Sequence, residues 1–87
     1  MTTEELRVSI LELVRPTGGV GLRPAGVLAQ LKIGRLCRRE REIRESLRWL
    51  ADRGFLEKTA SEVSPSDVRV RVSAKGIDFL EARDNAF

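Results

Sequence analysis

Histidine and tyrosine are both absent from this chain of 87 residues. Their absence removes the commonest general base, the usual nitrogen ligand of metals and a phenolic proton donor. The glycine-rich stretch at Gly18, Gly19 and Gly21 lacks the Lys-Ser/Thr pair of a phosphate-binding loop. The carboxylates and serines that remain are scattered over faces that we expect to be solvated. We therefore expect a protein that is not an enzyme and that uses no cofactor and no metal ion.

Cysteine and long apolar runs are also scarce. Cys37 is the single cysteine, so an internal disulfide is excluded and a reducing compartment such as the cytoplasm fits best. No apolar run approaches the roughly 20 residues that cross a membrane. The N-terminal stretch MTTEELRVSI is acidic and lacks the basic start and apolar core of a secretory signal. We expect a cytoplasmic protein with no membrane partner.

The charge that is present is unevenly distributed. The chain carries 16 basic and 13 acidic residues, which gives a net charge of +3. Residues 35–53 hold 7 basic and 4 acidic residues, a local net charge of +3, while residues 1–34 carry +1 and residues 54–87 carry −1. A basic excess concentrated on one segment permits a nucleic-acid partner.

The first third of the chain predicts two helices. Residues 3–15 have the apolar spacing of an amphipathic helix. Thr2 and Glu5 form a capping-box pattern at its start, and Pro16 disfavours its continuation. Residues 24–33 form the second predicted helix, which begins with a proline suited to a first helical turn.

A third helix is predicted over residues 38–53. Ile43, Leu47 and Leu50 are spaced four and three residues apart, so they share one stripe that we expect to be buried. Gly54 is well placed to end this helix.

A hairpin and a closing helix are predicted after the third helix. Residues 55–60 and 68–72 have the pattern of strands, and the polar stretch between them is typical of a turn. In the second strand three valines alternate with two arginines, so one apolar face is expected to cover the core. Ser73 is a suitable N-cap for a last helix over residues 74–83. A brief extended piece is also predicted at residues 20–22.

The order of the predicted elements defines a fold class. Three short helices bury their apolar stripes only in a common core, and the hairpin covers the side that remains open. We therefore expect an α+β fold, a winged helix-turn-helix with a three-helix core, a two-stranded β-hairpin wing and a C-terminal helix. Residues 1–87 are expected to form one such domain.

Two stretches resemble winged-helix regulators. Residues 43–56, IRESLRWLADRGFL, resemble their recognition helix and following strand, where a Leu-x-x-Leu-x-x-x-Gly-apolar ending is common. Residues 72–80, VSAKGIDFL, resemble the Leu-Thr-x-x-Gly run that opens their last helix. The Trp49-Leu50 pair and the small size are similar to small winged-helix proteins carried by Mu-like prophages. The resemblance implies a DNA-binding regulator of transcription.

In winged-helix regulators the third helix enters the DNA major groove, and we expect the helix over residues 38–53 to do the same. Its face opposite the buried stripe carries arginines suited to phosphates and guanine edges. The second strand of the hairpin points two more arginines outward. The residues expected to contact double-stranded DNA are Arg35, Arg38, Arg39, Arg41, Arg44, Arg48, Arg69 and Arg71.

The same residues support a second hypothesis. Glu45 lies four residues after Arg41, and Asp52 lies four residues after Arg48, a spacing typical of a solvated, ion-paired helix surface. The predicted loop over residues 61–67 carries two acidic residues and no basic one. These features favour a winged helix that serves as a protein–protein interaction module, a phage or host adaptor, and does not bind DNA.

Three large apolar residues are candidates for an oligomer interface. Trp49 either fills a core gap between the third helix and the hairpin or anchors a partner. Phe79 and Leu80 are expected to join Trp49 because so small a core does not readily bury all three. A homodimer built on this surface would match a palindromic DNA site.

Overall fold

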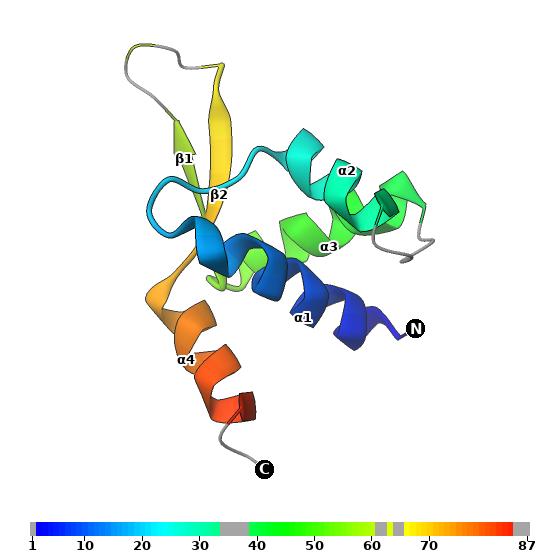
Figure 1. The fold of residues 1–87 in the computed structure, drawn as a ribbon, viewed down its shortest axis with the longest axis vertical. Coiled ribbons are helices and arrows are strands. Elements are labelled where there is room, and N and C mark those ends of the chain that lie inside the picture. The colour runs from blue at the N-terminus through cyan, green and yellow to red at the C-terminus, as the bar shows by residue number, and fades with distance from the viewer. Residues whose placement is uncertain (1, 34–38, 61–62, 64–65, 85–87) are drawn as a thin grey trace.

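The computed structural model describes residues 2–33, 39–60, 63 and 66–84. Within these residues the chain forms four α-helices, one short 3-10 helix and a two-stranded antiparallel hairpin, which confirms the α+β class (Figure 1). In chain order the elements are α1 (Thr3–Val14), η1 (Arg15–Thr17), α2 (Pro24–Ile33), α3 (Glu40–Asp52), β1 (Leu56–Ala60), β2 (Val68–Val72) and α4 (Ala74–Asp84).

The ends of α1 and α2 follow their local sequence signals. The Thr2 side-chain oxygen accepts a hydrogen bond from the Glu5 backbone N–H at 3.1 Å, so the predicted N-cap of α1 is confirmed. The α-helical geometry ends at Val14, one residue before the predicted end, because the chain tightens into η1 at Pro16. The bounds of α2 are the predicted ones.

The third helix is shorter than predicted at both ends. Arg39 has extended backbone angles and serves as the N-cap, so α3 begins at Glu40. The helix ends at Asp52, and Gly54, with a φ of 82°, reverses the chain in a left-handed conformation. The predicted buried stripe is confirmed, because Ile43, Leu47 and Leu50 all lie in the core.

The hairpin sheet has a third, very short member. In the register of β1 and β2, Leu56 lies opposite Val72 and Ala60 lies opposite Val68. On the other side of β2, the Leu22 N–H donates to the Val70 carbonyl at 2.8 Å and the Val70 N–H donates to the Leu22 carbonyl at 2.9 Å. The extended piece predicted at residues 20–22 is therefore present at Leu22.

The valine face of β2 covers the core along only part of its length. Val70 is buried and Val72 is half-buried, but Val68 is 38% exposed. The prediction that all three valines cover the core is therefore wrong for Val68. The reason is visible in Figure 1, where the hairpin projects beyond the helices toward its tip.

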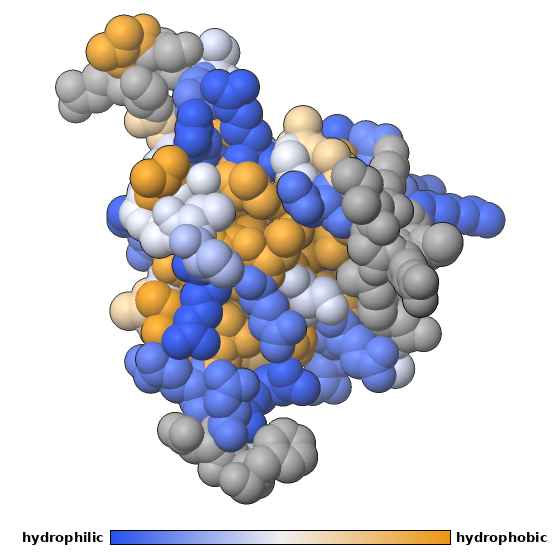
Figure 2. All heavy atoms as spheres, viewed as in Figure 1, coloured by the Kyte–Doolittle hydropathy of each residue, from blue (hydrophilic) through white to orange (hydrophobic). Residues whose placement is uncertain are grey.

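The core lies where α1, α2, α3 and the base of the hairpin meet. Figure 2 shows apolar atoms gathered at this junction and hydrophilic atoms around it. The largest fully buried side chains come from all three helices of the core: Leu6, Ile10, Leu11, Val14, Val27, Ile43 and Leu50. The last helix contributes Leu80, which is also buried.

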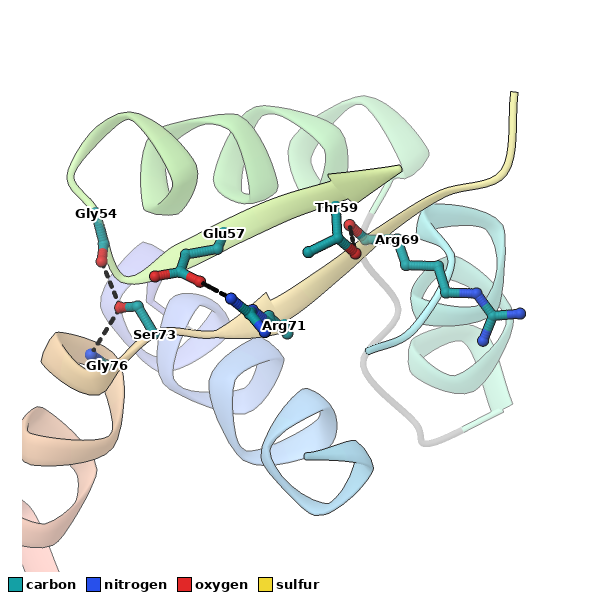
Figure 3. Close-up of polar contacts among 7 residues, drawn as sticks. All are labelled: Gly54, Glu57, Thr59, Arg69, Arg71, Ser73 and Gly76. Atoms are coloured by element: carbon teal, nitrogen blue, oxygen red, sulfur yellow. Dashed lines mark hydrogen bonds and ion pairs between the residues drawn. The ribbon is translucent and has the colours of Figure 1, made fainter. Parts of the chain in front are cut away.

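Ser73 joins the hairpin to both neighbouring helices. Its Oγ accepts a hydrogen bond from the Gly76 backbone N–H at 3.2 Å, so the predicted N-cap of α4 is confirmed. The same hydroxyl donates to the Gly54 carbonyl just after α3 (Figure 3). One buried hydroxyl therefore fixes the start of α4 against the end of α3.

Candidate nucleic-acid interface

The outer face of α3 is rich in arginine. Because Ile43, Leu47 and Leu50 point into the core, the residues on the opposite side of the helix are turned outward. Arg41, Arg44 and Arg48 are all exposed, and the side chain of Arg41 is 89% accessible. The structure thus brings these three predicted residues together on one surface.

Two of these arginines pair with carboxylates on the same helix. Arg41 Nε lies 3.1 Å from Glu45 Oε1, and Arg44 Nη2 lies 2.9 Å from Glu40 Oε1. Both pairs are four residues apart and exposed to solvent, where such pairs contribute only a few tenths of a kcal/mol, about 0.3–0.5. A phosphate competes readily for guanidinium groups that are held so weakly.

Arg48 differs from its neighbours on α3. Among the residues that the structure describes, no carboxylate forms an ion pair with it, so the predicted pairing of Arg48 with Asp52 is wrong. The surface of α3 is therefore not uniformly neutralised. Arg48 is the cation of this face that is available without breaking an existing pair.

Of the three other arginines predicted to contact DNA near α3, the structure describes one. Arg39 is exposed at the N-cap of the helix. Arg35 and Arg38 lie outside the described residues, so their predicted role stays a prediction.

Both arginines of β2 pair with carboxylates. Arg71 Nη2 lies 2.8 Å from Glu57 Oε2, its direct neighbour in the register, and Figure 3 shows this pair lying across the hairpin. Arg69 Nε lies 3.5 Å from Asp67 Oδ2. In Figure 3 the Arg69 side chain extends away from the hairpin, toward the segment that leads into α2.

Arg23 is a member of this group that the sequence did not reveal. It lies just before α2, and its Nε donates to Asp67 Oδ1 at 2.8 Å. Asp67 therefore sits between Arg23 and Arg69, and it links the start of α2 to the hairpin. The 44 residues that separate Arg23 from Asp67 explain why no local spacing predicted the pair.

The carboxyl group of Asp67 responds to these neighbours. The hydrogen bond from Arg23 is the largest influence, and together with the charges of Arg23 and Arg69 it holds the pKa of Asp67 below its usual value. Asp67 therefore remains ionised at a lower pH than an isolated aspartate.

The lowered pKa of Asp67 predicts a pH-dependent contribution to stability. A carboxylate whose pKa is lower in the folded state stabilises the fold above its unfolded pKa, and this contribution is lost as the pH falls through the folded pKa. The wild type should therefore exceed Asp67→Asn in free energy of unfolding at neutral pH, and the difference should shrink in strong acid. Urea unfolding across a pH series measures it. A difference that grows toward acid pH would contradict the assignment.

The predicted interface residues divide between surface and core. Trp49 is half-buried and stacks on Phe55, with ring centroids 6.2 Å apart. Phe79, also half-buried, packs against Phe55 in a tilted arrangement, with ring centroids 5.5 Å apart. Leu80, in contrast, is only 2% exposed, so it belongs to the core and is not available to a second protein.

The described part of the chain contains neither a membrane-spanning helix nor a metal-binding group. None of the helices there is long and apolar enough to span a bilayer. The same residues contain no group of three or more Asp, Glu, Cys or His side chains arranged to hold a metal ion.

In comparisons with known proteins, the chain matches no protein-family profile, no curated protein sequence and no solved structure.

Proposed function

We propose that this protein is a winged-helix DNA-binding protein, a transcriptional regulator that places α3 in the major groove. The outer face of α3 carries the proposal, because three exposed arginines lie opposite a buried aliphatic stripe. A helix of 13 residues with one free face is the element that enters a major groove in helix-turn-helix proteins. The sequence resemblance to winged-helix regulators, including those of Mu-like prophages, points in the same direction.

The hairpin supports the same proposal as a wing. Arg69 and Arg23 share Asp67 near the start of α2, so two guanidinium groups are held together beside the helical core. Each is paired through an exposed or half-exposed contact that a phosphate oxygen can replace. The hairpin would then contact the DNA backbone while α3 reads the groove.

A fluorescence anisotropy titration with a labelled random-sequence duplex at two salt concentrations tests the proposal. We expect binding at low salt that weakens steeply as salt rises, since each phosphate contact lowers the log–log slope by about 0.9. The double variant Arg41→Ala/Arg48→Ala should bind about tenfold more weakly at low salt, and its salt slope should be smaller by about 2.

Arg15→Ala/Arg83→Ala is the matched control. It removes the same charge from the contact of α4 with α1 and η1, where Arg15 of η1 pairs with Glu81 and Arg83 pairs with Glu12 of α1. Its DNA affinity should stay within about twofold of the wild type. Equal losses in the two double variants would defeat the assignment of the α3 face.

A protein–protein interaction module is the second candidate function. The observation that favours it is the pairing of Arg41 with Glu45 and of Arg44 with Glu40, which gives α3 a mixed rather than a purely basic surface. The absence of any duplex binding at low salt would refute the first proposal and leave this alternative standing.

A further inference from the structure

An open cleft of about 280 Å³ lies between α1, the end of α3 and α4. It is separate from the outer face of α3, and no part of the proposed DNA contact uses it. Its apolar lining consists of Val8, Leu11, Trp49, Leu50, Phe55 and Phe79. The volume lies just below the roughly 300–1,000 Å³ of small-molecule pockets, so it suits a protruding side chain better than a whole small ligand.

Three cations surround the aromatic wall of this cleft. The guanidinium carbon of Arg7 lies 3.6 Å from the centroid of the Trp49 ring, and that of Arg53 lies 5.0 Å from the same centroid. Lys75 Nζ lies 4.7 Å from the centroid of the Phe55 ring. The faces of the aromatic rings therefore attract positive charge to this surface.

None of these three cations forms an ion pair with a carboxylate of the described chain. Lys75 donates to the Arg53 carbonyl, and Arg7 Nε is buried with no hydrogen-bond partner among the described atoms. Arg15 of η1 and Arg83 of α4, in contrast, pair with Glu81 and Glu12. Three unpaired cations therefore lie around the cleft, and Glu4 is the single carboxylate of its lining, whereas Glu42 and Glu45 line the adjoining cleft that shares Arg7 and Trp49.

We propose that this cleft binds an acidic peptide segment of a partner protein, with a bulky apolar side chain in the cleft and carboxylates on Arg7, Arg53 and Lys75. Charge complementarity selects this occupant, because Arg7 lines the cleft, Arg53 and Lys75 lie over its aromatic rings, and the lining itself holds one acid. A second copy of the chain would bring the same three cations to the contact. Trp49 supplies the rigid aromatic surface that anchors such interfaces.

The test uses the full chain and two short synthetic peptides, each with a central Leu-Phe pair. One peptide is flanked by glutamates and the other by lysines, and binding is followed by the fluorescence of Trp49, the one tryptophan of the protein. We expect the acidic peptide to bind and the basic one not to bind. Arg53→Gln/Lys75→Gln should weaken binding of the acidic peptide about fivefold, and Arg7→Gln should weaken it further.

The variant Glu4→Gln tests the same charge effect in the opposite direction. Removing the single acid of the lining should strengthen binding of the acidic peptide by about twofold. Arg41→Gln/Arg48→Gln is the control for general charge, and it should leave peptide binding unchanged while it weakens DNA binding. Arg53→Gln/Lys75→Gln should leave DNA binding unchanged. The proposal of DNA binding by α3 and the proposal of peptide binding by the cleft can therefore be refuted separately.

Three results would overturn the inference. Equal binding of both peptides would show that charge does not select the occupant. An equal loss in the α3 control would show that the acidic peptide follows net charge alone. Sedimentation that detects a dimer, lost in Arg53→Gln/Lys75→Gln, would assign the cleft to a second copy of this chain.

Discussion

Replacing Gly76 by alanine should lower the free energy of unfolding by about 2 kcal/mol, although alanine is the better helix former. A Cβ at this position would lie 2.5 Å from the Phe55 carbonyl oxygen and 2.6 Å from Val72 Cγ1. The first obstacle is backbone, which cannot rotate away as a side-chain end can. Overpacking of this kind lowers the free energy of unfolding by up to about 3 kcal/mol, and the better helix propensity of alanine offsets about 1 kcal/mol of that loss.

Gly19→Ala is the matched control for Gly76→Ala. No atom lies within 4 Å of a Cβ built at Gly19, and its φ is negative or extended, so the same substitution should change stability by less than about 0.5 kcal/mol. Urea unfolding followed by circular dichroism measures both variants. Equal stability of the two variants would show that α4 does not approach the Phe55 backbone as closely as the structure places it.

Replacing Ile43 by alanine should cost about 2–5 kcal/mol of stability, a large share of the roughly 5–15 kcal/mol of a typical domain. The Ile43 side chain, near the start of α3, is completely buried. Its truncation removes buried apolar surface and leaves a cavity that the neighbouring helices fill only in part. The same urea titration measures the loss.

Arg48→Ala on the opposite face of α3 gives the complementary result. This side chain is exposed and unpaired among the described residues, so its removal should change stability by less than about 0.5 kcal/mol. It should, however, weaken DNA binding, whereas the folded fraction of Ile43→Ala should bind DNA as the wild type does. If Arg48→Ala lost stability and Ile43→Ala lost DNA binding instead, the face of α3 that carries Arg48 would be the buried one.

Local sequence signals were sufficient for most of the fold. The spacing of Ile43, Leu47 and Leu50 predicted which side of α3 is buried, because a helix repeats its direction every 3.6 residues. Pro24 predicted the start of α2, since its ring suits a first turn. Alternation in β2 predicted a strand but not how far the hairpin extends past the core, and Val68 is therefore more exposed than expected.

The candidate sites were less predictable because they depend on contacts between distant segments. The pair of Arg23 with Asp67 forms only when the start of α2 meets the hairpin. The spacing of Arg41 and Glu45 predicted their pair correctly, yet the identical spacing of Arg48 and Asp52 gave none. An exposed helix pair is worth so little that local surroundings decide whether it forms.

The backbone bridge between Leu22 and Val70 has a consequence for the hairpin as a whole. One end of β2 is tied by Ser73 to the turn after α3, and its middle is tied to the segment that enters α2. Gly21 permits the second tie, because a Cβ there would lie 2.7 Å from the Val70 oxygen. The base and the middle of β2 are therefore both fixed to the helical part of the fold. The outward side chains of the hairpin can be replaced without changing the direction in which the hairpin points.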